Sequence, residues 1–402
     1  MKILNLTTAI PSKYGTGADI ASQHFINAMK KLGHAVSVVG YQRWDDSHPD
    51  NYDQNTIAVG KRHIETKAAG YHPLIWGAIA LFQQLPYTSA KYYSNRYVKT
   101  VKSLLSKHSY DAIILEHSSQ LYWLKSAIGD RAKVAILAHN LEHEIYLERL
   151  KDASNPLAKW VYQREAQLVK QIEDELAVTS QEIWTLTEHD ADYFMKLGKK
   201  EAVRIFELPA TVTEPVDPTH PKTCDVSMIG SWIWKPNADG LRYFFDQIYP
   251  RLPSHLSIRV AGRGAEWLSG KYSNVEYLGF VPDAQEFLAQ ARVVAIPSIR
   301  GGGIQLKSLE AIGLGLRVVA TPFALRGIVA PPTTVRLAES PEQFADSLQS
   351  AIADSITPSD LESVKVWVQN RHSQFLHSVD TGLKSLINQN KGILTRIEEI
   401  CS

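Results

Sequence analysis

Residues 300–315 read Arg-Gly-Gly-Gly-Ile-Gln-Leu-Lys-Ser-Leu-Glu-Ala-Ile-Gly-Leu-Gly, and the prediction of the fold starts from this stretch. The apolar run 293–297 before it is typical of a buried strand. Leu306, Leu309 and Ile312 then recur near helical spacing. The three glycines therefore lie where a strand passes into a helix, where backbone amides and the helix dipole can hold a phosphate. A glycine-rich turn without a ligand is the alternative.

Ionisable side chains flank the three glycines. Arg300 and Lys307 add positive charge, and Glu310 lies one turn further along the expected helix. These side chains favour an anion site with a carboxylate nearby for hydroxyl groups. Solvated surface positions would explain each of them equally well when taken singly.

The composition is that of a soluble globular protein of about two domains. Of 402 residues, 44% are hydrophobic and 21% are charged, which argues against disorder. Lys and Arg number 43 against 42 Asp and Glu, giving a net charge of +1. A nucleic-acid partner is therefore not expected, because such proteins are usually strongly basic.

The cysteines and the apolar runs bear on the cellular location. Cys224 and Cys401 are the only cysteines, so a disulfide framework or a thiolate metal site is not expected and a cytoplasmic location is predicted. The longest mostly apolar stretch, 74–82, falls well short of the ~20 residues that span a bilayer. Peripheral attachment at the inner face of the membrane stays open.

Residues 74–97 carry the argument for membrane contact. Here Trp76, Phe82 and several tyrosines alternate with Lys91 and Arg96. Aromatic and basic residues together are typical of a lipid headgroup boundary. The alternative is that they form the half-buried face of long helices.

The N-terminal half begins as a parallel α/β unit. Strand-like residues 3–6, a loop to Gly17, a helical pattern that ends at Gly33 and a second strand at 35–39 predict a right-handed crossover. Gly15-x-Gly17 lacks the third glycine of a dinucleotide fingerprint. The loop either lets a substrate approach the backbone or simply makes the turn.

Polar residues follow the buried strand 133–137. The sequence continues Ala138-His139-Asn140-Leu141-Glu142-His143-Glu144. Ligands of parallel α/β sheets bind beyond the carboxyl ends of the strands, so sugar or acid–base contacts are expected here. A metal is not expected, because no cysteine or evident third ligand accompanies the two histidines. Helix caps and surface polarity are the alternative.

The proline-rich segment 209–221 is interpreted as a linker between two α/β halves. The predicted domains are therefore residues 1–208 and 222–375, followed by a helical segment, 376–402. In the second half Lys235, Arg263, Lys307 and Glu310 all follow strands, which is where a parallel sheet gathers its ligand contacts.

Taken together, these residues resemble the GT-B sugar transferases of the large group 1 retaining family over nearly the whole chain. The motifs that carry the resemblance are Gly230-Ser231-x3-Lys235-Pro236-Asn237, Gly262-Arg263-Gly264, Leu278-Gly279-Phe280-Val281 and Gly301-Gly302-Gly303-Ile304-Gln305-Leu306-Lys307-x2-Glu310. Each motif is weak alone, but their order within one α/β half is specific. The resemblance implies two Rossmann-like domains facing across a cleft. The first would bind the acceptor and the second a nucleotide-sugar donor.

The resemblance also implies a role for single residues. Lys235 and Lys307 match diphosphate contacts, Arg263 would line the same site, and Glu310 would meet the nucleotide ribose. His139 is similar to the histidine near the anomeric carbon. Further donor contacts are expected from Gly15 and Gly17 near the diphosphate, Phe280 and Val281 at the base, and Gly301, Gly302, Gly303 and Ile304 at the phosphate or sugar.

One position departs from the family pattern. Many members carry a second glutamate eight positions before Glu310, where this sequence has Gly302. A glycine offers no carboxylate to the donor sugar, so backbone amides or another side chain must recognise its hydroxyls.

The function expected from the resemblance is transfer of a sugar, with retention, from a nucleotide-sugar to a glycan, lipid-linked or other acceptor. Cations and amides that stabilise the leaving diphosphate would drive it without a metal or cofactor. A nucleotide-sugar epimerase and a non-catalytic nucleotide-sugar-binding protein stay open as alternatives. A dehydrogenase is disfavoured, because neither half has a full Gly-x-Gly-x-x-Gly after its first strand.

Overall fold

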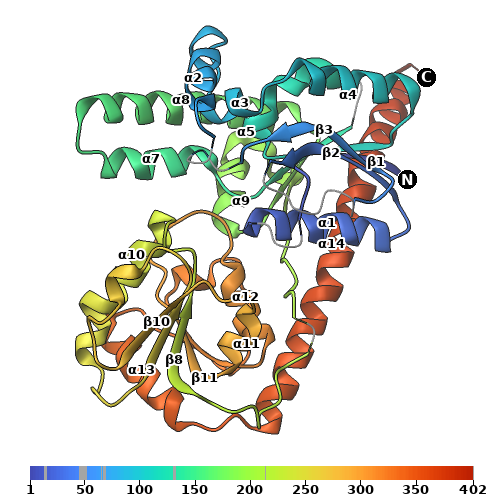
Figure 1. The fold of residues 1–402 in the computed structure, drawn as a ribbon. Helices are drawn as coiled ribbons and strands as arrows, with labels where there is room; N and C mark the ends of the chain where they lie inside the picture. The colour runs from blue at the N-terminus through green and yellow to red at the C-terminus, as the bar shows by residue number, and fades with distance from the viewer. Residues whose placement is uncertain are drawn as a thin grey trace. The chain divides into compact units, whose positions relative to one another are not determined.

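The computed structural model describes the whole chain except residues 13–15, 45–51, 65, 67–68, 130–132, 213 and 402, and except the side chains of 199 and 389–401. It divides into two compact units (Figure 1). Unit 1 comprises Met1–Phe206 together with the residues from Phe375 onward, and unit 2 comprises Glu207–Gln374. Gly15 falls outside the described residues.

Unit 1 contains a parallel sheet in the order β3-β2-β1-β4-β5-β6-β7. Its strands are β1 (Lys2–Ala9), β2 (Ala35–Arg43), β3 (Thr56–Arg62), β4 (Ala112–Glu116), β5 (Val134–Ala138), β6 (Glu182–Thr185) and β7 (Val203–Ile205). Leu4 of β1 pairs with Ser37 on one side and Ile113 on the other. The strand order reverses between β1 and β4, so the ligand edge of this sheet is at their carboxyl ends.

Helices follow most strands of unit 1, and local sequence explains where they begin. They are α1 (Gly17–Lys31), α2 (His72–Phe82), α3 (Tyr87–Tyr92), α4 (Asn95–Lys107), α5 (Ser118–Leu121), α6 (Lys125–Ile128), α7 (Glu142–Asp152), α8 (Pro156–Thr179) and α9 (Glu188–Phe194). Thr16 and Asp19 form a capping box at α1. Asn155 accepts a hydrogen bond from the Ala158 amide at 2.8 Å, and Pro156 opens α8 at a position where no amide donor is needed.

Unit 2 contains a second parallel sheet in the order β10-β9-β8-β11-β12-β13. Its strands are β8 (Cys224–Ile229), β9 (Ile258–Ala261), β10 (Val275–Gly279), β11 (Ala291–Ile296), β12 (Arg317–Ala320) and β13 (Val335–Leu337). Its helices are α10 (Lys235–Tyr243), α11 (Ala284–Ala289), α12 (Leu306–Gly313) and α13 (Pro341–Ala353), followed by α14 (Pro358–Cys401). In chain order this is the Rossmann order 3-2-1-4-5-6, with its reversal between β8 and β11.

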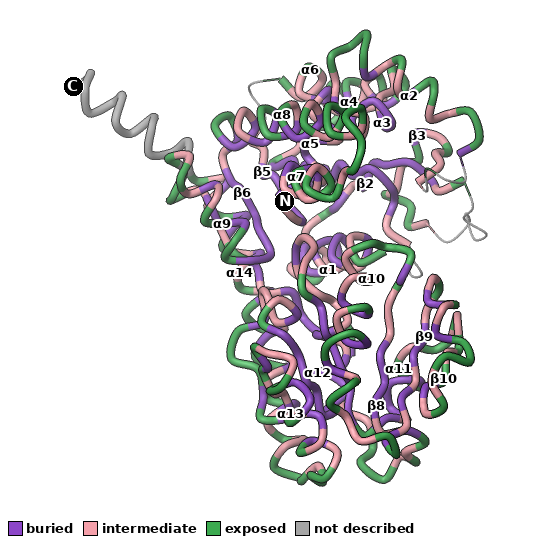
Figure 2. The backbone as a smooth tube through the Cα atoms, turned by 90° about the vertical axis from the view of Figure 1, so that its left-hand side faces the viewer, coloured by how far each residue is buried: buried purple, intermediate pink, exposed green. Residues whose placement is uncertain are grey.

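The central strands of each unit are buried, whereas the edge strands β3, β7, β10 and β13 are partly exposed, and the outer sides of the helices are exposed (Figure 2). The strands therefore read as continuous apolar runs, as expected for parallel sheets covered on both faces. The predicted fold class, two Rossmann-like α/β domains, is confirmed. Among the described helices, none combines the length and apolarity required to cross a bilayer.

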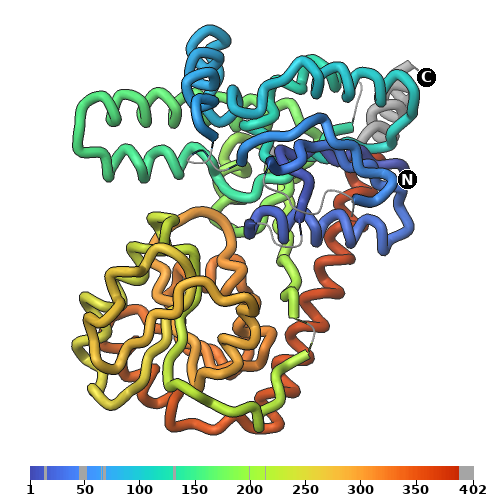
Figure 3. The backbone as a smooth tube through the Cα atoms, in the orientation of Figure 1, coloured from blue at the N-terminus to red at the C-terminus, as the bar shows by residue number. Residues whose placement is uncertain are grey.

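The C-terminal helix differs from the predicted segment 376–402. The single helix α14 begins at Pro358, and its residues from Phe375 onward belong to unit 1 (Figure 3). The Phe375 ring lies 4.9 Å from that of Phe25, between ring centroids, and Phe25 also stacks on Trp184 at 5.8 Å. The apolar spacing of the helix is visible in the sequence, whereas the unit it packs against is not.

The segment 209–221, interpreted as a linker, is packed within unit 2. A Cβ atom added to Gly313 of α12 would lie 3.0 Å from Ala210 Cβ, and the Val216 amide donates to the Leu314 carbonyl at 2.9 Å. Its prolines prevent regular secondary structure without preventing contact.

Two glycines of unit 2 with positive φ differ sharply in their surroundings, and this difference predicts their tolerance of alanine. Gly262 has φ +110° and a Cβ there would lie 1.8 Å from the Gly230 carbonyl oxygen, whereas Gly270 has φ +69° and nothing within 4 Å. In Gly262→Ala the clash would lower the free energy of unfolding by about 1–3 kcal/mol, and the strained backbone would lower it further by a similar amount. Gly270→Ala carries the backbone strain alone. Urea denaturation followed by circular dichroism should show the larger loss of unfolding free energy for Gly262→Ala, and equal losses would contradict the close packing of the two loops.

Candidate functional site

The ligand edge of unit 2 is built by the loops after β8 and β11, the neighbouring strands at which the order reverses. Lys307 Nζ donates to Asn237 Oδ1 at 3.1 Å and so joins the start of α12 to the start of α10. Arg300 forms an ion pair with Asp239, a second link between the same loops. A Cβ on Gly301 would lie 3.4 Å from Pro236 Cβ. The predicted Lys235-Pro236-Asn237 motif and the glycine loop are therefore side by side.

Lys307 is the second residue of α12 and has a neutral hydrogen-bond acceptor in Asn237. Its charged end is crowded by protein, and this burial lowers the pKa of the ammonium group to about 8. A bound anion would restore the lost solvation and raise that pKa again. A negatively charged ligand would therefore stabilise the charged form of Lys307.

Lys235 is exposed and lies 3.2 Å from both carboxylate oxygens of Asp239. Asp239 also holds Arg300. The carboxylate partly offsets both cations, so Lys235 contributes less net charge than its position in the motif suggests. Asp239 was not identified from the sequence, although it lies one helical turn after Lys235.

Glu310 lies one turn after Lys307 on α12, with Gln285 Nε2 donating to its Oε1 at 3.4 Å. Burial, with a smaller contribution from Asp283, raises the pKa of Glu310. Hydroxyl donors of a ligand would stabilise the ionised form.

The glycine loop supplies the backbone conformation that the predicted anion site requires. Gly301 and Gly303 have φ of +130° and +63°, and the helix that follows has no side-chain cap at Gln305. The amides at the beginning of α12 are therefore not capped by Gln305. Gly302 and Ile304, between and after these glycines, are half-buried.

Arg263, Phe280 and Val281 follow the neighbouring strands β9 and β10. The Arg263 guanidinium lies 5.2 Å from the centroid of the Phe280 ring, and this ring is 67% exposed. Val281 is half-buried. The Trp232 indole donates to the Ala261 carbonyl at 2.9 Å and fixes the loop after β8 against that after β9. An exposed ring beside a guanidinium offers a surface on which a planar base can stack.

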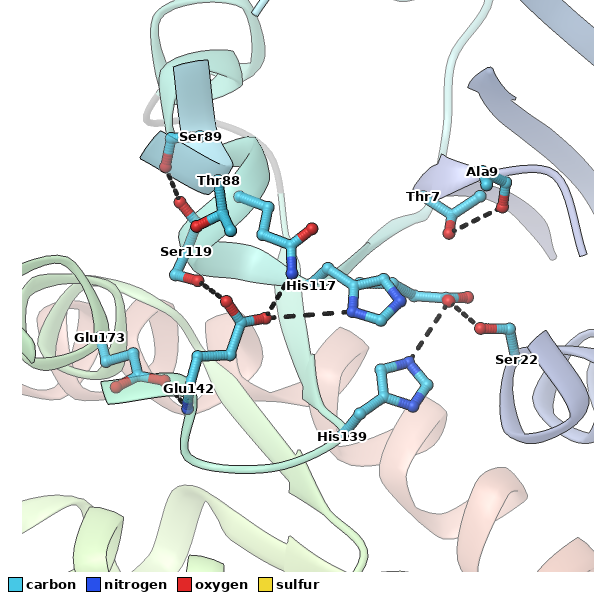
Figure 4. A network of polar contacts seen from close by, with 12 residues as sticks. Thr7, Ala9, Ser22, Thr88, Ser89, His117, Ser119, His139, Glu142 and Glu173 are labelled. Atoms are coloured by element: carbon cyan, nitrogen blue, oxygen red, sulfur yellow. Dashed lines mark hydrogen bonds and ion pairs between the residues drawn. The ribbon is translucent and has the colours of Figure 1, made fainter. Parts of the chain in front are cut away.

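Of the two N-terminal loop glycines that are expected to contact the donor, Gly17 lies within the described residues. It is the exposed first residue of α1. His139 lies at the carboxyl end of β5, as expected, within a buried polar network (Figure 4). Its Nε2 is 3.5 Å from Glu116 Oε2, and its ring stacks on His117 with 4.5 Å between centroids. Within the described part of the chain neither ring nitrogen of His139 has a hydrogen-bond partner, although the residue is only 8% exposed.

Glu116 and His117 hold His139 in place. Glu116 accepts from Asn5 Nδ2 at 2.7 Å and from the Ser22 hydroxyl. His117 has a left-handed backbone, φ +48°, which turns its ring toward His139. Burial lowers the pKa of His117 to about 3, so this ring is neutral. Sequence reasoning missed both residues, although Glu116 ends β4 and His117 follows it, just as His139 follows β5.

The next buried carboxyl group in this network is Glu142. It accepts from the Ser119 hydroxyl and from Gln120 Nε2 at 3.1 Å, and lies 4.0 Å from His117 Nδ1. Burial, together with the nearby charge of Glu173, raises the pKa of Glu142 to about 7.

The second histidine of this segment, His143, contacts Glu173 Oε2 through its Nδ1 at 2.6 Å. Glu116, His117 and His139 do bring their potential ligand atoms within 4.8 Å of one another, a donor set that suits a divalent transition metal. However, Asn5 and Ser22 already donate to the two oxygens of Glu116, and these contacts hold the carboxylate without a metal.

Comparisons with known proteins support the fold. Residues 223–354 match the family described as "Glycosyl transferases group 1". No curated protein matches the sequence. The structure is similar to that of sucrose-phosphate synthase from Thermosynechococcus elongatus, with a TM-score of 0.63 at 16% identity over 100% of both chains.

Two further solved structures are similar over nearly the whole chain. WaaG, a glycosyltransferase involved in lipopolysaccharide biosynthesis, has a TM-score of 0.60 at 16% identity, covering 94% of this chain and 99% of its own. HepE from Anabaena, in complex with UDP and glucose, has a TM-score of 0.56 at 15% identity, covering 98% of this chain and 100% of its own.

The raised pKa of Glu142 predicts a pH-dependent effect of Glu142→Gln. An acid whose pKa is higher in the folded than in the unfolded state loses stability as pH rises from its ordinary value near 4.5 to about 7. The glutamine variant should therefore gain about 2–3 kcal/mol relative to wild type between pH 5 and pH 8. Urea denaturation at the two pH values measures the difference. Exposed Glu201→Gln is the control, and an equal pH dependence in both variants would contradict the assignment.

Proposed function

We propose that this chain, whose residues 223–354 match the group 1 glycosyl transferase family, transfers a sugar from a nucleotide-sugar donor to a glycan, lipid-linked or other acceptor. The observation that carries the proposal is the position of Lys307: a crowded ammonium group with a neutral partner, at the start of α12 and beside the glycine loop. Such a site favours a ligand with concentrated negative charge, and the diphosphate of a nucleotide-sugar has that property.

The chemistry follows from where charge develops. The bond between the anomeric carbon and the donor phosphate oxygen breaks, and its electron pair remains on the leaving nucleoside diphosphate. Lys307, Lys235 and the amides of the glycine loop would stabilise that charge, and one such contact contributes about 3 kcal/mol to the transition state. Because these groups supply the positive charge, the proposed reaction proceeds without a metal or cofactor.

The acceptor hydroxyl forms the new bond to the anomeric carbon, and its proton passes to the leaving phosphate. We propose that this occurs on the face that the phosphate leaves, so that the anomeric configuration is retained. His139 would accept or donate a hydrogen bond near the reacting carbon. Its Nδ1, which has no hydrogen-bond partner among the described residues, and its support by Glu116 and His117 favour this role.

The nucleoside would occupy the outer part of the site in unit 2. Glu310 would receive the ribose hydroxyls, and Phe280 with Arg263 and Val281 would contact the base. In place of the carboxylate that Gly302 lacks, the glycine-loop amides would meet the sugar hydroxyls. The predicted cytoplasmic location, where nucleotide-sugars are the expected substrates, belongs to the same proposal.

Gly302 favours one second candidate, a nucleotide-sugar-binding protein without transferase activity. A thermal-shift screen against UDP-, GDP-, ADP- and dTDP-sugars, with mass spectrometry of the products, separates the two. A donor that binds the native state raises the melting temperature, and only a transferase also consumes it when an acceptor is supplied. Isomerisation of the sugar without an acceptor would indicate an epimerase instead. If no nucleotide-sugar shifts melting, both donor-binding proposals are wrong.

Lys307→Met tests the diphosphate contact, because methionine keeps the apolar stem and removes the charge. We expect kcat/KM for the donor identified in the screen to fall by about 100-fold or more. Lys271→Met, on the same unit and outside the site, is the control and should retain wild-type turnover. Wild-type turnover by Lys307→Met would remove this residue from the site.

Glu310→Gln tests the ribose contact. The amide can accept one hydroxyl hydrogen bond but loses the charge-assisted strength of the carboxylate. We therefore expect about a tenfold weaker binding of the nucleoside diphosphate in isothermal titration calorimetry. The exposed Glu286→Gln on α11 serves as the matched control. Unchanged affinity in Glu310→Gln would mean that the carboxylate does not meet the nucleotide.

A further inference from the structure

Helix α2 presents an unpartnered apolar side to solvent. Its eleven residues, His72–Phe82, include no Asp, Glu, Lys or Arg. Trp76 and Ala80 are buried against unit 1, whereas Leu74, Leu81 and Phe82 are 79%, 63% and 87% exposed. Their spacing places them with the exposed Ile75 and Ala78 on one side of the helix. Single exposed apolar residues are ordinary, but a continuous helix side of this kind marks an interaction surface.

Aromatic residues border this side of α2. Tyr71, 68% exposed, stacks on His72 at the start of the helix. Arg164 of α8 donates to the carbonyls of Ala80 and Leu85, so α8 lies against the end of α2. One turn before Arg164, Trp160 is 58% exposed. Tryptophan and tyrosine at the border of an apolar surface are typical of a membrane–water interface.

The charge around α2 is one-sided. Residues 66–110 include no aspartate or glutamate, and their basic residues are Lys67, Lys91, Arg96, Lys99, Lys102 and Lys107. Of these, the four on α4 are exposed. Figures 1 and 2 place α2, α3 and α4 together along one end of unit 1. The chain as a whole carries only +1, so the segment 66–110 is far more basic than the chain average.

The residues predicted at a headgroup boundary from the sequence divide between the core and this surface. Trp76, Tyr92 and Tyr97 are buried, and Lys91 donates to the Ile64 carbonyl. Phe82 is exposed, together with Leu74 and Leu81, which the sequence argument did not single out. Part of the alternation of aromatic and basic residues thus belongs to the core, and the solvent-facing apolar side of α2 is a separate feature.

We propose that α2 docks on the surface of an anionic lipid bilayer. Its apolar side would enter the boundary between headgroups and acyl chains, with Tyr71 and Trp160 at the border. Arg96, Lys99, Lys102 and Lys107 of α4 would face the anionic headgroups. An anionic bilayer complements the basic residues of α4, whereas a second copy of the chain would bring two strongly basic surfaces together. Docking of this kind needs no donor or acceptor and is independent of the proposed transfer reaction.

Co-sedimentation of the full chain with vesicles tests the docking. We expect binding to vesicles that contain phosphatidylglycerol, weaker binding to phosphatidylcholine alone, and a loss of binding as salt screens the charges. Leu81→Ser/Phe82→Ser should reduce the partition coefficient about tenfold or more. The matched control is Leu337→Ser/Val366→Ser, two exposed apolar residues of unit 2, which should bind as wild type does.

A second pair of variants tests the electrostatic contribution to vesicle binding. Lys99→Glu/Lys102→Glu should lower binding to phosphatidylglycerol vesicles about tenfold or more. Lys365→Glu/Lys384→Glu changes the net charge equally at exposed sites elsewhere and should bind like wild type. Circular dichroism and nucleotide-sugar thermal shifts should be the same for all four variants, so that loss of docking is separated from failure of the fold or of the donor site.

Three outcomes would overturn the proposal. Wild type that does not bind phosphatidylglycerol vesicles would exclude an anionic bilayer as the occupant. Vesicle binding that survives Leu81→Ser/Phe82→Ser would place the contact elsewhere. The third outcome is a wild-type protein that does not bind vesicles but forms a dimer in light scattering. If Leu81→Ser/Phe82→Ser dissociates that dimer, the apolar side of α2 binds a second copy of the chain.

Discussion

A fully buried carboxylate, Glu116, is the constraint on which the ligand edge of unit 1 depends. It ends β4, accepts from Asn5 of β1 and Ser22 of α1, and lies beside His139 after β5. Burial alone would raise the pKa of Glu116, but its contacts with His139 and Ser22 outweigh burial and lower it. The ionised group thus fixes three strands and a helix at the point where the strand order reverses. Loss of the carboxylate would leave buried donors unpaired, each at a cost of about 1–3 kcal/mol.

Among the described residues of unit 2, no buried carboxylate holds the ligand edge together. Its loops approach through glycine, since no side chain fits at Gly262 beside Gly230 or at Gly240 beside Pro297. The polar contacts of this edge are between half-buried or exposed groups, such as Lys307 with Asn237 and Arg300 with Asp239. Unit 1 therefore presents a rigid, preorganised histidine, whereas unit 2 presents amides and cations that can adapt to a charged ligand. Each unit therefore suits the chemistry proposed for it. Unit 1 would make a single hydrogen bond, and unit 2 would stabilise the negative charge of a diphosphate.

The sequence predicted the two parallel α/β units and the residues that follow their strands, because apolar runs and glycine turns are local signals. It also predicted that Lys235, Lys307 and the glycine loop would share one edge, which follows from parallel topology. It did not reveal Glu116, His117 or Asp239, because their importance depends on partners far away in the chain. The prolines of 209–221 indicated irregular backbone but could not show that this segment packs on α12. Nor could the aromatic spacing of 74–97 distinguish the buried Trp76 from the exposed Phe82, since both fit one helical pattern.

The passage of α14 from unit 2 into unit 1 has a consequence for how the protein is made. Phe375 completes the aromatic cluster of Phe25, Trp184 and Phe206, yet the ribosome reaches it only after all of unit 2 has been synthesised. At ordinary rates of synthesis this interval lasts roughly ten to thirty seconds. During that time the N-terminal half is a nascent chain with an uncovered aromatic surface, whereas unit 2 emerges as one continuous segment. The domain that is translated first is therefore the one that finishes folding last, and its exposed rings make it the natural client of chaperones that hold nascent chains.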